Sequence, residues 1–226
     1  VEPATVNQML TCIIEGNRPE RSPEMRLAAI TALNNSIEFA SSNFEVQQER
    51  DALIRAMCEA TQAKESKIRE RAFECCAEVA EFYYNKLQPY VEVLYNLSIN
   101  AIRTDQPSVG MQAIEFWNTI CDQELNILAD IEDGEASESE LLKIIHQAAA
   151  GLIPLLLECM TKQEEDLEDE DNWNISMAAA TLLESMAKVI EDQIVDLVLP
   201  FVTQNINNAN WRLKEAAVMA FGMILE

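Results

Sequence analysis

The sequence offers few residues that could perform acid–base or nucleophilic chemistry. His146 is the only histidine, and it lies in an apolar stretch without a nucleophile or metal ligand spaced to pair with it. A glycine-rich phosphate loop and a strand–turn–helix nucleophile motif are also missing from the sequence. We therefore predict that the chain is not an enzyme and has no catalytic residues, no cofactor and no metal site.

The six cysteines lack the paired spacing of zinc ligands. Each lies in an apolar, helix-like pattern, so we expect reduced thiols packed in a core. Cys75 and Cys76 are adjacent, but neighbouring residues on a helix point about 100° apart, which disfavours a disulfide between them. The six are Cys12, Cys58, Cys75, Cys76, Cys121 and Cys159.

An acidic run followed by a tryptophan is the strongest candidate for a binding site. It comprises Glu164, Glu165, Asp166, Glu168, Asp169, Glu170 and Asp171, with Trp173 after it. One interpretation is a solvated connection. A second, metal binding, is weaker because the run lacks the glycine turn and ligand spacing of an EF-hand. The third is a contact site for a basic partner, in which the carboxylates attract a Lys or Arg that stacks on Trp173.

The overall charge also favours basic partners. The formal net charge is −23, from 39 acidic against 16 basic side chains. A field of this sign repels nucleic acid and anionic membrane surfaces, and it attracts basic polypeptide segments. No apolar run approaches the ~20 residues that span a bilayer, and no signal peptide opens the chain. We expect an intracellular protein that binds neither nucleic acid nor membrane, and a chain that is part of a longer one.

The candidate residues lie in or between helices that follow a repeated pattern along the sequence. Five segments, starting at residues 23, 68, 109, 173 and 211, share a polar or aromatic start and a helix rich in small residues. An amphipathic helix precedes each segment. Apart from a longer third interval, the spacings are close to the ~40 to 47 residues of HEAT or armadillo repeats. Because each unit has two helices and no short glycine-rich third, HEAT repeats are favoured.

The predicted fold is therefore all-α: an α-solenoid (superhelix) of about five HEAT repeats, formed by residues 1–226 as a single solenoid. Alanine pairs early in the second helix of a unit, such as Ala28-Ala29, Ala178-Ala179 and Ala216-Ala217, would allow neighbouring helix axes to approach closely. The long third interval contains two insertions. One is the acidic, turn-like stretch 130–140, and the other is the run 164–171. The predicted units are 1–43, 44–86, 87–129, 130–190 and 191–226.

Trp117 and Trp211 lie on second helices of units, which usually line the concave face of a solenoid. Tryptophan is enriched among residues that anchor partners. The sequence leaves both residues open between core packing and partner binding, whereas neighbouring Phe116 is predicted to be a core residue.

Several motifs together resemble the importin-β (karyopherin-β) family of nuclear transport receptors, over essentially the whole chain. They are Glu115-Phe116-Trp117-Asn118 with Cys121-Asp122, Thr161-Lys162-Gln163 before the acidic run, Val198-Leu199-Pro200-Phe201, and Trp211-Arg212 leading to Ala216–Gly222. The likeness is to the central part of the family's N-terminal half.

The resemblance implies a nuclear import receptor that binds the importin-α adaptor or basic cargo, FG nucleoporins and Ran-GTP. Such a receptor would be found in the cytoplasm and the nucleus and at the nuclear pores of the nuclear envelope. It assigns Ran and adaptor binding to the acidic loop, Glu164 to Asp171 with Trp173. It assigns nucleoporin binding to Leu10, Thr11, Ile14, Glu49 and Leu53, although Ala52 stands where an aromatic residue is common. It assigns concave adaptor binding to Glu115, Trp117, Asp122 and Trp211.

Two alternatives remain from the residues alone. Without the resemblance, Leu10 and Ile14 are ordinary core residues. A HEAT-repeat scaffold that has no role in transport would show the same helix pattern, and binding of an FG-repeat peptide would distinguish the two functions.

Overall fold

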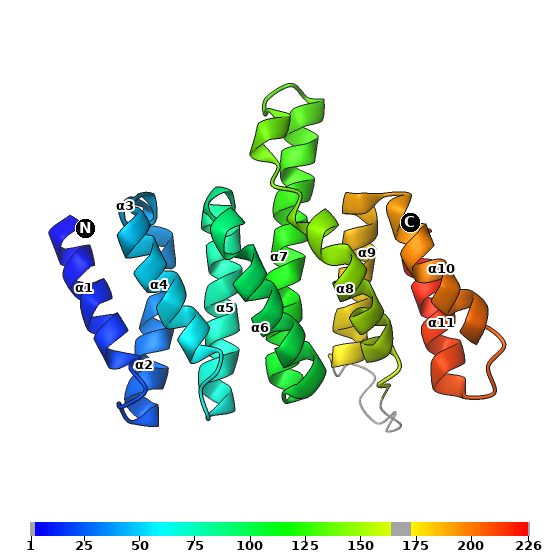
Figure 1. Cartoon of the computed structure of the whole chain (residues 1–226), viewed down its shortest axis with the longest axis horizontal. Helices are drawn as coiled ribbons and strands as arrows, with labels where there is room; N and C mark the ends of the chain where they lie inside the picture. The colour runs from blue at the N-terminus through cyan, green and yellow to red at the C-terminus, as the bar shows by residue number, and fades with distance from the viewer. Residues whose placement is uncertain (1–2, 164–172, 226) are drawn as a thin grey trace.

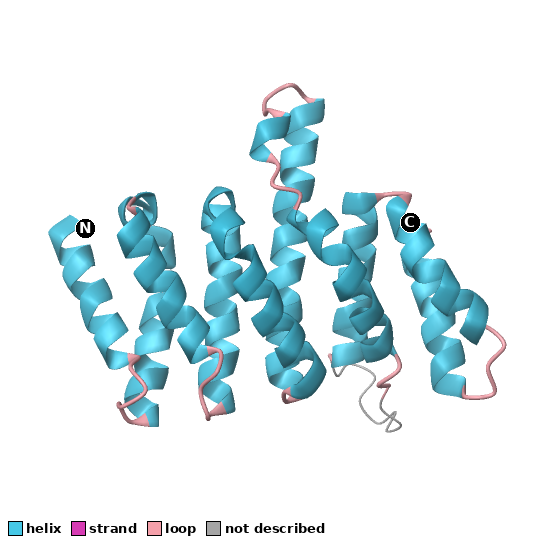
Figure 2. Ribbon diagram, viewed as in Figure 1, coloured by secondary structure: helices cyan, strands magenta, loops and turns pink. Residues whose placement is uncertain are grey.

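The chain is an elongated row of helices. The computed structural model describes residues 3–163 and 173–225, and this part consists of helices and turns without a β-strand (Figures 1 and 2). The α-helices are α1 (Pro3–Gly16), α2 (Pro23–Asn34), α3 (Ser41–Glu45), α4 (Gln47–Ala60), α5 (Ser66–Tyr83), α6 (Val91–Thr104), α7 (Pro107–Glu132), α8 (Ile144–Met160), α9 (Ile175–Ile190), α10 (Gln193–Asn205) and α11 (Trp211–Met223). Short 3-10 helices are η1 (Ile37–Phe39), η2 (Tyr84–Lys86), η3 (Gln88–Tyr90) and η4 (Glu138–Glu140).

The helices form two layers. We call α1, α4, α6, α8 and α10 the A layer, and α2, α5, α7, α9 and α11 the B layer. Each A helix packs on the B helix that follows it, and each B helix packs on the next B helix along the row. The two ends of the chain therefore lie at opposite ends of the row (Figure 1). The predicted all-α solenoid of paired helices is confirmed, while the residue boundaries of the five units stay a prediction.

The starts of the B helices follow from local sequence. Ser22 accepts a hydrogen bond from the backbone N–H of Met25, and Pro23 occupies the first turn of α2. Asn174 caps α9 through the N–H groups of Ser176 and Met177, and Asn210 caps α11 through that of Arg212. These side chains satisfy backbone donors that a helix leaves unpaired in its first turn.

The core is continuous along the row, between the two layers. Its largest buried side chains include Phe44, Phe73, Phe116 and Trp117. The core position predicted for Phe116 is confirmed. Among the described residues, no helix combines the length and apolar character needed to cross a membrane.

Two expectations about core residues are wrong in part. Five of the six cysteines are buried, but Cys12, on α1, is exposed. Ala28 is likewise exposed whereas its neighbour Ala29 is buried. The pairs Ala178-Ala179 and Ala216-Ala217 are buried as predicted.

The helix α7 is longer than the repeat pattern predicts. It runs for 26 residues to Glu132 and projects beyond its neighbours, so part of the stretch expected to form a turn is helical (Figure 1). The chain then reverses at Gly134, whose φ of 76° is in the left-handed region that favours glycine. We call this projecting segment, residues 130–140, the protrusion.

A buried carboxylate fixes the chain between the protrusion and α8. Oε1 of Glu124 on α7 accepts hydrogen bonds from the Tyr84 hydroxyl (2.8 Å) and from the backbone N–H groups of Ile144 (2.5 Å) and Ile145 (3.4 Å). The Tyr84 hydroxyl in turn accepts from the N–H of Leu142. Lys143, the N-cap residue of α8, provides no side-chain cap. Glu124, on α7, accepts the hydrogen bonds from the first turn of α8 instead.

Candidate functional site

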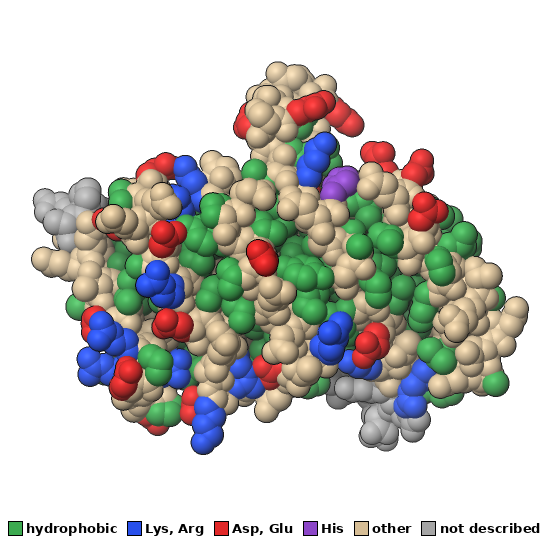
Figure 3. All heavy atoms as spheres, in the orientation of Figure 1, with side chains coloured by type: hydrophobic (Ala, Val, Ile, Leu, Met, Phe, Trp, Pro, Cys, Tyr) green, Lys and Arg blue, Asp and Glu red, His purple; other side chains and the backbone are tan. Residues whose placement is uncertain are grey.

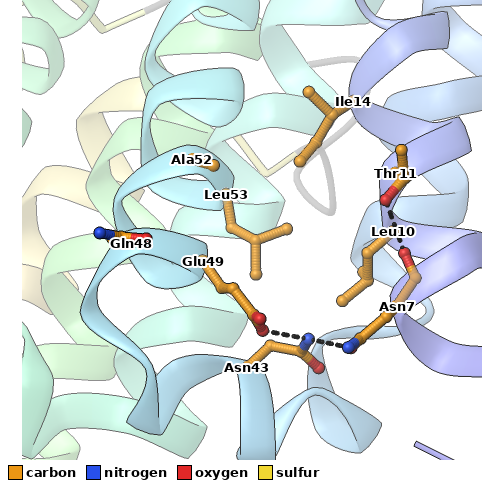
Figure 4. A pocket seen from close by; sticks show the side chains of 9 residues that line it. All are labelled: Asn7, Leu10, Thr11, Ile14, Asn43, Gln48, Glu49, Ala52 and Leu53. Atoms are coloured by element: carbon orange, nitrogen blue, oxygen red, sulfur yellow. Dashed lines mark hydrogen bonds between the residues drawn. The ribbon is translucent and has the colours of Figure 1, made fainter. Parts of the chain in front are cut away.

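A pocket lies between the A-layer helices α1 and α4. The side chains of Leu10, Thr11 and Ile14 approach it from α1, and those of Glu49 and Leu53 approach it from α4 (Figure 4). Its volume is about 370 Å³, and Asn7, Asn43, Gln48 and Ala52 complete the lining. The structure therefore brings together all five residues to which the family resemblance assigned nucleoporin binding.

The floor of the pocket is a polar network. Nδ2 of Asn43 donates to Oδ1 of Asn7 (2.5 Å) and to Oε2 of Glu49 (2.7 Å), so one amide joins both walls (Figure 4). Asn43 belongs to the short helix α3, and its side chain is 3% exposed. This network fixes the Glu49 carboxylate, because a hydrogen bond to a charged group restricts its rotamers.

The apolar side chains in the walls of the pocket differ in how deeply they are buried. Leu10 and Leu53 are buried, whereas Ile14 is only half-buried. The half-buried Ala52 leaves room where a larger side chain would fill the pocket. Apolar walls above a fixed carboxylate suit a peptide that inserts a hydrophobic side chain and offers an N–H group beside it.

Sequence reasoning missed the residues of the floor. Asn7 and Asn43 are polar and carry no periodic signal, and Asn43 lies in the segment that connects two helix pairs. Only the packing of α3 beneath α1 and α4 brings this amide to the pocket, so repeat spacing could not have found it.

A second candidate surface is the exposed side of the B layer. Glu115 and Asp122 are both exposed on α7, two helical turns apart and hence on the same side of the helix. Partial burial, and then repulsion from Glu115, raises the pKa of Asp122. This surface therefore holds like charges that a cationic partner would stabilise.

A similar group of carboxylates lies on α5. Partial burial raises the pKa of Glu78, and repulsion from Glu81, Glu38 and Glu74 adds to the shift. On the opposite side of the molecule, apolar side chains gather in the grooves between A-layer helices, and acidic side chains gather on the protrusion (Figure 3).

The tryptophans differ in exposure. Trp117 is 1% exposed, and its Nε1–H donates to Oγ of Ser98 (2.9 Å). The prediction that Trp117 contacts a partner is therefore wrong for this structure, because its indole ring fills the core between α6 and α7. Trp211 is 48% exposed, with the guanidinium of Arg212 5.1 Å from its ring centroid, and Trp173 is 53% exposed.

The acidic run, Glu164 to Asp171, lies outside the described residues. Its position between α8 and α9 follows from the helices on either side. Just before it, Nε2 of Gln163 donates to the backbone oxygen of Arg212 (3.1 Å), and Nε of Arg212 donates to the oxygen of Gln163 (3.4 Å). Gln163, the last described residue before the run, therefore lies beside the first turn of α11, which carries Trp211.

The residues that could do chemistry are spread through the structure. His146 is half-buried, and burial lowers its pKa. Burial raises the pKa of the Cys58 thiol to about 11 and the pKa of Cys76 well above its usual value, which disfavours thiolate formation. Within residues 3–163 and 173–225, no three His, Cys, Asp or Glu side chains gather as a metal site would require.

Comparison with known proteins finds no matching family model, but it finds clear relatives. The chain is 45% identical to importin subunit beta-1 of Arabidopsis thaliana over 100% of this chain and 26% of that protein. It is 41% identical to importin subunit beta-1 of Schizosaccharomyces pombe over 99% of this chain and 26% of that protein. The chain thus spans about a quarter of the length of these curated relatives.

Solved structures agree with the sequence relatives. Yeast importin-beta (Kap95p) matches with a TM-score of 0.93 and 36% identity, over 99% of this chain and 26% of that one. The Kap95 chain of a Kap95:Nup1 complex gives the same values. A structure described as Kap95p binding to RanGDP, with implications for nuclear import complex assembly, matches with a TM-score of 0.91 and 37% identity, over 96% of this chain and 26% of that one.

Proposed function

The chain belongs to the importin-β family, as a segment that spans about a quarter of its relatives (26%), and from this we propose that it is part of a nuclear import receptor. In this proposal the A layer binds FG nucleoporins, and the B layer and acidic run bind Ran-GTP and either the importin-α adaptor or basic cargo. The receptor would move between cytoplasm and nucleus through the nuclear pore. It would act by binding alone, without catalysis.

The pocket between α1 and α4 is the observation that carries the proposal. Its apolar walls accept a phenylalanine ring, which buries well in an aliphatic environment. The carboxylate of Glu49, fixed by Asn43, can accept a backbone N–H from the peptide beside that ring. A related structure contains Kap95 with Nup1, which supports a nucleoporin as the kind of ligand.

Binding of an FG-repeat peptide to the 226-residue chain tests this assignment. Ile14→Asp places a charge on the half-buried wall of the pocket, so we expect the affinity to fall at least about tenfold, because a charge is poorly solvated there. Met9→Asp is the matched control, since Met9 is 52% exposed on the same helix and does not line the pocket. Equal affinity of the I14D variant and the wild type would exclude this pocket as the binding site.

The acidic B layer supports the second part of the proposal. Carboxylates that repel one another on α5 and α7 would be stabilised by the Lys and Arg side chains of an adaptor or cargo segment. Trp173, just before α9, and Trp211, at the start of α11, are exposed toward the other end of the row. The related structure of Kap95p with RanGDP supports Ran as a further partner, and competition between Ran-GTP and the basic segment would release cargo.

A HEAT-repeat scaffold without a role in transport is the alternative function. Such a scaffold would share the helix pairs but would not bind FG-repeat peptide in the α1–α4 pocket. The peptide experiment therefore separates the two functions, provided that circular dichroism shows wild-type helicity in the I14D variant.

A further inference from the structure

We propose that Ser137, on the protrusion, is a phosphorylation site for an acidophilic serine kinase. Such kinases select a serine followed by carboxylates, because their substrate grooves are lined with basic side chains. In this proposal the Ser137 Oγ attacks the γ-phosphorus of ATP. The new Oγ–P bond replaces the bond to ADP, which leaves, and the hydroxyl proton passes to the kinase base.

The sequence around Ser137 is the first observation. Ser137 is followed by Glu138 one residue on and by Glu140 three residues on, and Glu135 precedes it. In the whole sequence, Ser137 is the only serine with carboxylates at both the first and the third following positions. Ser42, with Glu45 three residues on, has Asn43 directly after it.

Accessibility is the second observation. Ser137 is exposed, and the protrusion that carries it extends beyond the neighbouring helices (Figure 1). Its backbone is already extended, with φ −106° and ψ 146°. Kinases bind substrates in an extended form, so only the three residues of η4 must unwind for the following carboxylates to enter the groove, at small cost. Ser42, by contrast, lies within helix α3.

The local hydrogen bonds give phosphorylation a structural consequence. Oγ of Ser137 accepts from the N–H of Ser139 (3.3 Å), and the Glu140 carboxylate accepts from the N–H of Ser137 (3.0 Å). A phosphate adds a charge of about −1.5 to −2 at pH 7 and would repel that carboxylate. Glu140 and Ser139 also border a groove formed with Phe82 and Ile127, so modification would alter the edge of this groove.

The experiment is to incubate the 226-residue chain with ATP and a purified kinase of the casein-kinase type, and to locate phosphate by mass spectrometry. We expect one phosphate, on Ser137, and none on Ser42 or Ser139. Ser137→Ala should abolish the modification while leaving the thermal unfolding curve unchanged. Phosphate on Ser42 or Ser139 instead, or no phosphate on the wild type, would overturn the proposal.

A charge-matched pair of variants tests whether position or net charge determines the rate. Changing Glu138 and Glu140 to Gln should lower the phosphorylation rate about tenfold, because charge-assisted contacts to the kinase are lost. Changing Glu132 and Asp133 to Gln and Asn removes the same charge from the protrusion but should leave the rate within about twofold. Equal rates for the two variants would contradict the assignment.

Discussion

Glu124 carries a carboxyl group that is fully buried, unlike the carboxylates on the surface. It is 0% exposed, and Oε2 has no hydrogen-bond partner within the described residues, whereas Oε1 accepts three hydrogen bonds. Burial outweighs those donors and raises the pKa of Glu124. A carboxyl whose pKa is raised by folding stabilises the native state most when it is protonated.

The pH dependence of stability should therefore differ between the wild type and Glu124→Gln. The contribution of Glu124 is fully present below the unfolded pKa of about 4.3 and is lost as the pH rises through the higher folded value. We expect the wild type to lose stability relative to E124Q across this range, as measured by urea unfolding at several pH values. Glu132→Gln, which changes an exposed carboxyl on the same helix, should not reproduce the difference.

A parallel pH dependence for wild type and E124Q would mean that Glu124 is ionised in the fold without cost. Glu124→Ala should lower the free energy of unfolding at every pH by about 1–3 kcal/mol, because the N–H of Ile144 and the Tyr84 hydroxyl then lack an acceptor.

At the scale of single residues, the sequence patterns predicted which helix a residue lies on better than whether its side chain is exposed. Trp117 and Trp211 both lie on B-layer helices, yet only Trp211 is exposed. The buried Trp117 donates its Nε1–H to Oγ of Ser98 on the neighbouring helix α6, and no periodicity in α7 indicates that partner. Leu10 and Ile14 were assigned to nucleoporin binding only through the family resemblance, since their pattern alone predicts core residues.

At the scale of elements, the sequence predicted that helices occur in pairs but placed some of their ends wrongly. Trp173 and Trp211 align in the repeat, but α11 begins at Trp211 whereas α9 begins two residues after Trp173. The cap decides this difference, because Asn210 precedes its tryptophan and Asn174 follows its own. Likewise α7 extends into the acidic stretch, since a helix can continue into solvent where its residues remain compatible with helical structure.

The packing of α6 against α8 gives an element-scale prediction. A Cβ added at Gly151 on α8 would lie 1.8 Å from the Tyr95 Oη and 3.1 Å from its Cζ. Tyr95 also contacts Trp117 edge-on, with ring centroids 6.1 Å apart, so its ring cannot move without disturbing the core. We expect Gly151→Ala to lower the free energy of urea unfolding by about 1–3 kcal/mol.

A double-mutant cycle isolates the cause of this loss. Tyr95→Phe removes the oxygen nearest the new Cβ, so the double variant should be less destabilised than the sum of the single changes, by about 1 kcal/mol. Strictly additive effects would mean that the loss at Gly151 arises from helix α8 itself and not from its contact with α6.

At the scale of the whole molecule, the packing of the helix pairs determines where on the surface the negative charges lie. The net charge of −23 was evident from the sequence and favoured basic partners. Where the carboxylates gather could be predicted only in part. Glu74 and Glu78 are one turn apart on α5, but Glu38 joins them only when η1 packs against α5. A uniform negative field attracts any cation, whereas a surface of like charges on one layer also selects where the cation binds.

Salt dependence can separate the general field from the B-layer surface. For a fluorescein-labelled peptide rich in Lys and Arg, we expect the double change Glu115→Gln and Asp122→Asn to weaken binding by about three- to tenfold at low salt. The change Glu132→Gln and Asp133→Asn removes the same net charge from the protrusion and should weaken binding by less than about twofold. The difference should shrink near 1 M salt, where screening acts over about 3 Å. If both pairs lowered affinity equally, net charge alone would attract the peptide, and the B layer would have no specific role in binding it.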